Sequence, residues 1–137
     1  LYFWIKDYKN CYKMIDVTTA LNKDNSSVQT ILALSYLAKN QYENAVNDLE
    51  LLYTKDPTNS VLIYNLGLSY YYSLNPNKSI ELFLKLKEPI ELLPEVYYKI
   101  AKNFLLLNNY ESACFFYNKS KKMNYFKSFD NYSTYCK

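Results

Sequence analysis

The sequence contains no histidine, no arginine and only one glycine in 137 residues. All 16 of its basic residues are lysines. Histidine is the usual general base of enzymes and a common metal ligand, and arginine makes most bidentate contacts to phosphates and bases. Their absence excludes most catalytic mechanisms and argues against a nucleic-acid reader, as does a formal net charge of only +3. The composition favours a binding scaffold that needs no cofactor and no metal.

Long hydrophobic runs are absent too. The longest aliphatic cluster, Phe104–Leu107, is far shorter than the roughly 20 residues of a membrane span. The first residues, Leu1–Ile5, have no basic segment before them and no small-residue cleavage site after them, so they do not predict a secretory signal. Because the sequence starts in mid-pattern without methionine, we expect a piece of a longer protein, or its only ordered part.

Cysteine is scarce, with Cys11, Cys114 and Cys136 as its only instances. Their number is odd, and their spacing matches no metal site. A catalytic cysteine would need a base such as histidine, which the chain lacks. We therefore expect three reduced, mostly buried thiols in a reducing compartment. This predicts an intracellular location, in the cytoplasm or the nucleus.

Lysine, asparagine, tyrosine and isoleucine are abundant instead, including 17 tyrosines, as expected from the codon bias of an AT-rich genome. Half of the residues are hydrophobic and 21% are charged, so the chain is predicted to fold. With roughly 100–200 residues as the usual size of a domain, the length fits one domain.

The sequence repeats itself with a period of about 34 residues. The segments that start at Ser26, Ser60 and Pro94 align without a gap. Several columns keep the same type of residue: a large and a small residue at Leu32-Ala33, Leu66-Gly67 and Ile100-Ala101, an aromatic residue at Tyr36, Tyr70 and Phe104, and a second small residue at Ala45, Ser79 and Ala113. So many columns in one register predict an internal repeat.

In this pattern the sequence resembles the tetratricopeptide repeat (TPR) family, whose unit places two aromatic residues, Leu-Gly, Ala, Phe and a closing Pro at fixed positions. The resemblance covers Ser26 to about Asn124, with half a unit upstream. The closing proline is present only as Pro57, and the opening tryptophan of the family is replaced in all three units. The resemblance implies an all-α fold, a right-handed α-solenoid of stacked antiparallel helix pairs.

The repeat register divides the chain into five parts. They are a partial repeat at 1–25, TPR units at 26–59, 60–93 and 94–127, and a C-terminal capping helix or the start of a further repeat at 128–137. Turn residues fall between the expected helices, as at Lys39–Gln41. Pro89 cannot donate an i→i−4 hydrogen bond, so we expect the helix from Pro76 to end or kink near Lys87, followed by irregular or 3₁₀ structure through Leu93.

The resemblance also implies which side chains line the concave groove of the solenoid. The candidate partner-binding residues on two successive first helices are Tyr64, Asn65, Leu68, Tyr71, Tyr98, Lys99, Lys102 and Leu105. Tyrosine combines a large contact area with a polar tip, which suits a recognition surface. The groove is therefore predicted to bind a protein or peptide.

The function implied by the resemblance is a non-catalytic scaffold for protein–protein interaction, as a segment of a larger protein in a multi-subunit assembly. The alternative is an RNA-binding helical-repeat protein, because pentatricopeptide repeats are also helix pairs of similar period. The lysines and aromatic residues after Ser120 could in addition stack on single-stranded nucleic acid. A co-chaperone with a carboxylate clamp fits less well. Only Asn65 and Lys99 match the positions of such a clamp, and Glu95 would repel a carboxylate.

Overall fold

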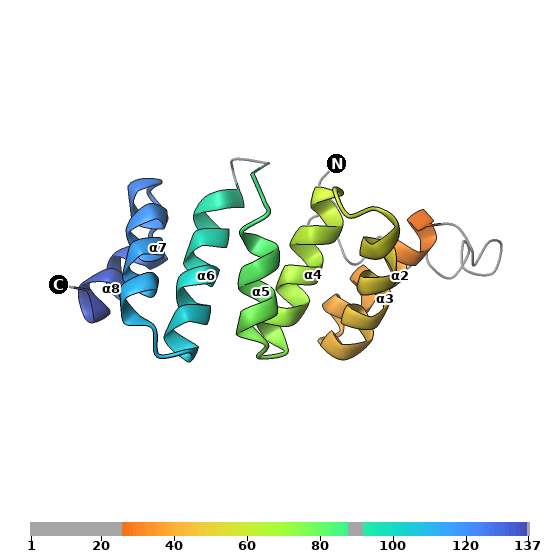
Figure 1. The fold of residues 1–137 in the computed structure, drawn as a ribbon, viewed down its shortest axis with the longest axis horizontal. Coiled ribbons are helices and arrows are strands. Elements are labelled where there is room, and N and C mark those ends of the chain that lie inside the picture. The colour runs from red at the N-terminus through yellow and green to blue at the C-terminus, as the bar shows by residue number, and fades with distance from the viewer. Residues whose placement is uncertain (1–25, 88–91, 137) are drawn as a thin grey trace. The chain divides into compact units, whose positions relative to one another are not determined.

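The computed structural model describes residues 26–87 and 92–136 of the chain. These residues contain seven α-helices and no strand (Figure 1). In chain order the helices are α2 (Ser26–Ala38), α3 (Tyr42–Lys55), α4 (Ser60–Tyr72), α5 (Pro76–Phe83), α6 (Leu93–Leu106), α7 (Tyr110–Lys122) and α8 (Lys127–Tyr135). The predicted all-α fold is confirmed for the described ranges.

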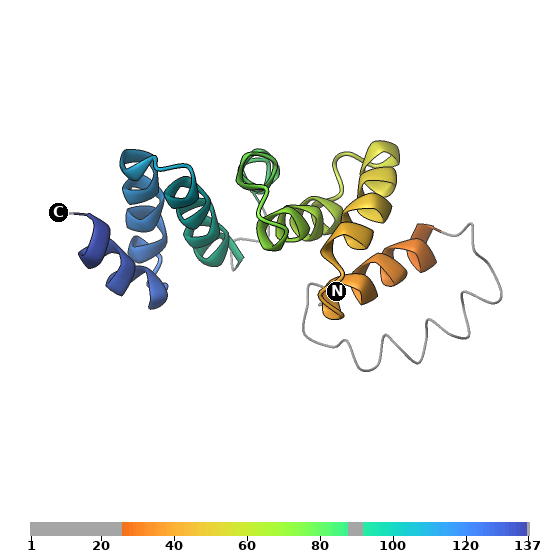
Figure 2. The same cartoon turned by 90° about the horizontal axis from the view of Figure 1, so that it is seen from below.

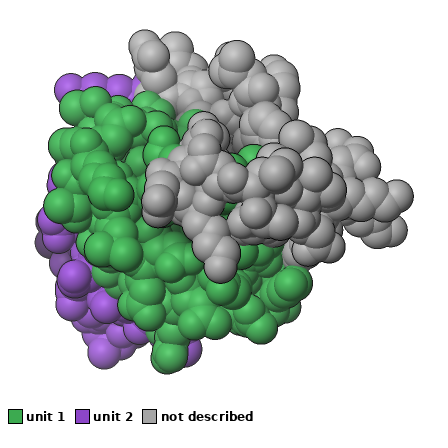
Figure 3. All heavy atoms as spheres, turned by 90° about the vertical axis from the view of Figure 1, so that its right-hand side faces the viewer, with its two compact units in different colours: residues 1–73 green, residues 74–137 purple. Residues whose placement is uncertain are grey.

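The chain divides into two compact units, residues 1–73 and 74–137, which Figure 3 shows in different colours. In the first unit α3 packs against both α2 and α4. In the second unit α6 packs against α5 and α7, and α8 packs against α7. Within each unit, successive helices lie side by side (Figures 1 and 2).

Asparagine caps define where two of the helices begin. The Asn59 side chain accepts hydrogen bonds from the N–H groups of Val61 and Leu62, at 3.0 and 3.3 Å, at the start of α4. Asn109 does the same for Ser112 at the start of α7, at 3.1 Å. Each cap satisfies backbone donors that have no partner inside the helix.

The 34-residue period is also visible in the backbone turns. Asn40, Leu74 and Asn108, one period apart, all adopt the left-handed conformation, with φ of 59°, 59° and 57°. After α6 the N–H of Asn109 donates to the carbonyl of Phe104 at 2.9 Å, which closes the helix in a Schellman-type turn. The repeat therefore fixes the geometry of the turn as well as the composition of the helices.

Small residues occupy the contacts between paired helices. Ala33 and Ala45 in the first unit, and Ala101 and Ala113 in the second, are fully buried. The last two share a hydrophobic cluster with Tyr117. A methyl group at these positions lets two helix axes approach closely, as the repeat columns predict.

Helix α5 is shorter than predicted. It ends at Phe83, whereas an end or kink near Lys87 was expected. The N–H groups of Lys85 and Leu86 donate to the carbonyls of Leu82 and Phe83, at 3.0 and 3.1 Å. These are i→i−3 bonds, so the chain tightens out of the α-helix before it reaches the proline.

Two predicted features lie outside the described residues. One is the partial repeat at 1–25, which includes Cys11, and the other is the stretch 88–91 around Pro89. On the far side of that stretch Leu92 has 3₁₀ geometry, and α6 begins at the next residue.

Cys114 on α7 and Cys136 directly after α8 form a disulfide, with their Cα atoms 5.6 Å apart. The prediction of three reduced thiols is therefore wrong for these two residues. Because α8 packs against α7, it brings together two cysteines that are 22 positions apart in the sequence. No spacing rule in the sequence signals this pairing.

Candidate partner-binding site

The eight predicted groove residues form four pairs, each made of one residue on α4 and its counterpart one period later on α6. The pairs are Tyr64 with Tyr98, Asn65 with Lys99, Leu68 with Lys102, and Tyr71 with Leu105. Helix α4 belongs to the first compact unit and α6 to the second. The two helices differ in how far they expose these side chains.

On α4 most of the candidate residues are buried. Tyr64, Asn65 and Leu68 expose 2%, 0% and 3% of their surface, and Tyr71 is half-buried. Helix α4 is apolar around most of its circumference, and every residue from 62 to 70 is buried. This stretch of the helix has no outward face, so three of the predicted surface residues lie in the interior of the protein.

Asn65 uses its amide group within its own helix. The side-chain NH₂ donates to the main-chain carbonyl of Val61 at 2.8 Å. Ser69 Oγ donates to the main-chain carbonyl of Asn65 at 2.7 Å. The side-chain oxygen of Asn65 is buried and has no hydrogen-bond partner. Asn65 is thus a polar core residue, inaccessible to a ligand at the surface.

On α6 three of the four candidate residues remain accessible. Tyr98, Lys102 and Leu105 are half-buried and follow each other at i, i+4 and i+7, which places them on one face of the helix. We call these three residues the α6 stripe. Lys102 Nζ lies 5.8 Å from the centroid of the Tyr98 ring, so the cation sits beside an aromatic face.

The fourth candidate on α6, Lys99, is buried and paired. Its Nζ donates to Glu95 Oε1 at 2.6 Å, one helical turn earlier, and the Lys99 side chain is only 9% exposed. The ion pair neutralises the charge that a carboxylate ligand would need. Asn65 and Lys99, the two residues that match a carboxylate clamp, are therefore both unavailable.

Helix α8 and the turn before it hold Tyr98 in place. The Asn131 side-chain amide donates to the Tyr98 hydroxyl at 3.0 Å. The Tyr98 ring lies 5.3 Å from the ring of Tyr125 and 5.8 Å from that of Tyr117. Sequence reasoning missed Asn131 and Tyr125 as neighbours of the stripe, because their position depends on how α8 packs.

Lysines and aromatic residues also associate elsewhere in the second unit. Lys119 Nζ lies 5.1 Å from the ring of Tyr97 and 5.2 Å from that of Phe115, and Lys121 Nζ lies 4.4 Å from the ring of Tyr132. These cation–π contacts attract the lysine side chains to aromatic rings of the same unit. The basic, aromatic C-terminal segment is thus folded against its own helix pair.

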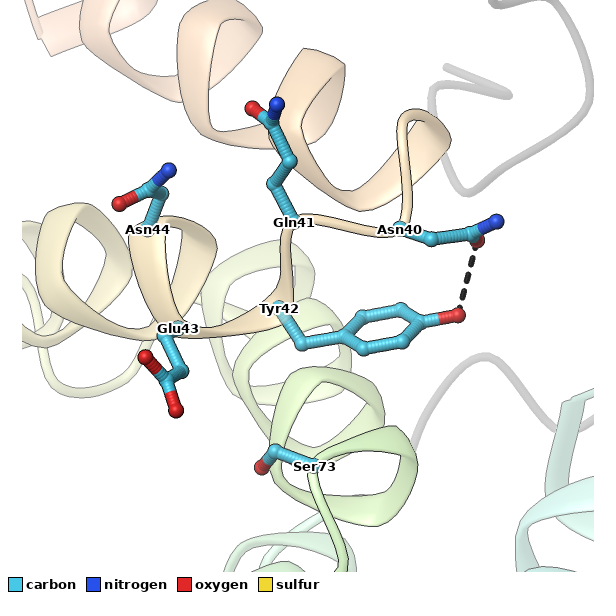
Figure 4. Close-up of a pocket in the computed structure, with 6 residues that line it drawn as sticks. All are labelled: Asn40, Gln41, Tyr42, Glu43, Asn44 and Ser73. Atoms are coloured by element: carbon cyan, nitrogen blue, oxygen red, sulfur yellow. Dashed lines mark hydrogen bonds between the residues drawn. The ribbon is translucent and has the colours of Figure 1, made fainter.

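An open cleft of about 400 Å³ lies at the turn between α2 and α3 (Figure 4). It is lined by Asn40, Gln41, Tyr42, Glu43, Asn44 and Ser73. The Tyr42 hydroxyl donates to Asn40 Oδ1 at 2.8 Å, and the Tyr42 ring stacks on that of Tyr72 with the centroids 5.2 Å apart. The cleft offers amides, hydroxyls and one carboxylate, with no nucleophile paired to a base.

Among the residues that the structure describes, Asp48 on α3 has a carboxyl group with a shifted pKa. Burial raises the pKa of the Asp48 carboxyl above its ordinary value of 3.8, because desolvation disfavours the charged form. In the other two repeats the same column holds Leu82 and Phe116. A carboxylate there occupies a position that suits an apolar side chain.

Within residues 26–87 and 92–136, no group of three or more His, Cys, Asp or Glu residues could hold a metal ion.

The paired helices and their 34-residue columns define an all-α helical-repeat protein. The tetratricopeptide repeat family model matches residues 26–59 and 94–126, and the chain belongs to this family. Repeats of the family generally mediate protein–protein interaction, bind protein partners and are typically non-catalytic. No curated protein matches the chain. None of the described helices has the length and apolar character that crossing a membrane requires.

Proposed function

We propose that the chain is a non-catalytic scaffold that binds a protein partner, and that the α6 stripe contacts this partner. The observation that carries the proposal is the exposure of the stripe. Tyr98 and Lys102 are half-buried, whereas Tyr64 and Leu68 at the matching positions of α4 are buried. Tyr71, which is half-buried on α4, is a further proposed contact in the first unit.

The chemistry of the stripe favours a partner segment that carries both an apolar and an acidic side chain. Leu105 and Tyr98 pack partly against the hydrophobic cluster of their own unit, and their remaining exposed parts offer apolar surface. Lys102 offers a positive charge between them along the helix. Lys99 adds no charge, because Glu95 neutralises it. Residues 74–137 contain ten lysines and six acidic residues, so the surrounding unit also attracts an acidic partner.

The absence of histidine supports the non-catalytic part of the proposal, because the chain lacks the commonest general base. We retain the wider role of a segment within a multi-subunit assembly as part of the same proposal. The cysteine argument for a reducing, intracellular compartment no longer supports that location, since two of the three cysteines are paired.

A photo-reactive amino acid at position 105 tests the contact in the native extract. We expect a protein adduct at Leu105 and none at Leu84, an exposed leucine of the same unit that lies outside the stripe. Adducts at position 84 without any at position 105 would remove the stripe from the binding surface. An RNA adduct at position 105 would favour the alternative, an RNA-binding helical repeat.

Once cross-linking has identified the partner, its affinity for variants of the chain tests the energetics of binding. Leu105→Ala should weaken binding by about tenfold, because apolar anchors dominate such interfaces, and Leu84→Ala should leave it unchanged. Lys102→Gln should mainly slow association and reduce its dependence on salt. Melting temperatures of all three variants show whether an effect on binding comes from unfolding instead.

A further inference from the structure

The disulfide attaches a short helix that packs one large aromatic side chain, Tyr132, against the hydrophobic cluster of the second unit. Helix α8 is nine residues long, and an isolated helix needs about 12–15 residues to be even marginally stable in water. Of its large aromatic side chains, Tyr132 is half-buried and packs against the second unit. Phe129 and Tyr135 point outward, 45% and 48% exposed, and Phe126 just before the helix is 71% exposed. Packing of apolar surface therefore makes only a limited contribution to holding α8 in place.

Beside Tyr132, the inward side of α8 makes its contacts through small or polar groups. Ser128 Oγ donates to Ser120 Oγ on α7 at 2.7 Å, and Asn131 donates to the Tyr98 hydroxyl at 3.0 Å. Each such bond adds little net stability, because both groups would bond to water if the helix left. Cys136 is the buried hydrophobic residue at this end, joining the cluster of Ala101, Ala113 and Tyr117.

The cysteines also lie where a small reductant could reach them. Both line an open cleft of about 410 Å³ between α7 and α8, together with Tyr110, Phe115, Tyr132 and Tyr135. Cys114 is half-buried, whereas Cys136 is 7% exposed. The sulfur of Cys114 is therefore the more accessible of the two to an incoming nucleophile.

We propose that Cys114–Cys136 is a thiol–disulfide exchange site for a dithiol reductant, and that its reduction releases α8 from α7. One thiolate of the reductant attacks Cys114 Sγ, forms a mixed disulfide and expels the Cys136 thiolate, which takes up a proton. The second thiol of the reductant loses its proton and attacks the reductant's own sulfur atom in the mixed disulfide with Cys114. This step expels the Cys114 thiolate, which is protonated in turn, while the reductant leaves as its own disulfide.

Release of α8 changes the surface that the second unit presents. The helix contributes Cys136 and Tyr132 to the cluster on α6 and α7, and Asn131 to the hydroxyl of Tyr98. When α8 leaves, this face of the helix pair becomes accessible next to the α6 stripe. The exchange and the release do not depend on the proposed partner binding, so the two proposals can fail separately.

Hydrogen–deuterium exchange of the 137-residue chain tests the proposal, with dithiothreitol as the dithiol. Under native conditions we expect dithiothreitol to make Cys114 and Cys136 reactive to iodoacetamide, as measured by mass spectrometry of peptides. The amides of residues 127–136 should then exchange about tenfold faster or more, because α8 opens locally. The amides of α3 (Tyr42–Lys55), in the other unit, should keep their rates and so report an intact fold.

Two variants separate the disulfide from side effects of the reductant. Cys136→Ser, without any reductant, should show the fast exchange of 127–136, and Cys11→Ser should show the slow exchange of the oxidised chain. If Cys136→Ser disturbs α3 as well, Cys114→Ser provides the same test with the sequence of residues 127–136 unchanged. The proposal is overturned if the bond resists dithiothreitol until the protein is unfolded, or if 127–136 exchange equally slowly in reduced and oxidised chains.

Discussion

Leucine is an unfavourable residue for the left-handed turn that follows α4. Leu74 has a φ of 59°, and Asn40 and Asn108 adopt the same conformation one period before and after it. In this conformation the Cβ of an ordinary residue lies too close to the backbone, whereas asparagine tolerates it better through local hydrogen bonds. Leu74 is 73% exposed, so burial of its side chain does not offset the backbone cost.

Substitutions at positions 74 and 108 should change the free energy of unfolding in opposite directions. Leu74→Asn should raise the free energy of unfolding by about 0.5–1 kcal/mol, and Asn108→Leu should lower it by a similar amount. Urea denaturation of the two variants and the native chain measures both effects. Destabilisation by Leu74→Asn would mean that the leucine side chain makes a contact worth more than the strain of its backbone.

The raised pKa of Asp48 predicts a pH dependence of stability. Burial raises the pKa of this carboxyl above 3.8 in the folded state. Between 3.8 and the raised pKa the unfolded chain ionises first, so stability falls as the pH rises through this window. Well below pH 3.8 the carboxyl is protonated in both the folded and the unfolded state, so it no longer lowers the free energy of unfolding.

Asp48→Asn removes this ionisation and so should stabilise the protein at neutral pH. Solvent screens a half-buried carboxylate, so we expect a gain of no more than about 0.5 kcal/mol. The gain should vanish well below pH 3.8, where both side chains are neutral. Thermal melts of variant and native chain across this range measure it, and a gain that does not change with pH would point to packing instead of charge.

At the scale of helices, the pairing could be predicted because its signal is local and repeated. The columns at Ala101 and Ala113 marked the close contact between α6 and α7, and both residues are fully buried there. Exposure on α4 could not be predicted in the same way. Its sequence is apolar around most of the helix, so periodicity marks no outward face, and the buried Tyr64 and Leu68 look like groove residues.

The disulfide could not be predicted for a related reason. It depends on α8 folding back against α7. The inward contacts of α8 include Ser128 and Asn131, which carry no hydrophobic signal, and Tyr132 is the single aromatic residue beside them. In the register of the repeat, Tyr135 falls in the small-residue column of Ala33 and Ala101. A bulky residue there favours the capping helix over the start of a further repeat, because a following helix could not pack as closely.

The contact between α6 and α7 can be tested with a larger side chain. Ala101→Leu adds three carbon atoms where neither helix can move away without losing its packing, so it should destabilise the protein by about 1–3 kcal/mol. Lys122→Leu, at an exposed position of α7, serves as the control and should shift stability by less than about 0.5 kcal/mol. Similar midpoints of urea denaturation for the two variants would show that α6 and α7 do not meet at Ala101.

At the scale of the whole molecule, the disulfide is a stabilising feature of the second compact unit. The second unit, residues 74–137, contains the disulfide and its own hydrophobic cluster of Ala101, Ala113, Tyr117 and Cys136. Helical-repeat proteins draw their stability from contacts between neighbouring elements, such as the α6–α7 and α7–α8 contacts inside the second unit. A domain below about 70–80 residues rarely gains more than a few kcal/mol from its core.

This comparison predicts that residues 74–137 fold as a separate fragment only while the disulfide is intact. Closing a loop with a sequence separation of 22 residues stabilises a protein by about 3 kcal/mol, comparable to the whole margin of so small a core. The oxidised fragment should show helical circular dichroism and a cooperative melt, and the reduced fragment should lose both, whereas the reduced 137-residue chain should stay folded. The fragment lacks Cys11, so no other thiol can exchange with the pair. Equal melting of the oxidised and reduced fragments would show that packing alone, without the disulfide, stabilises this half of the chain.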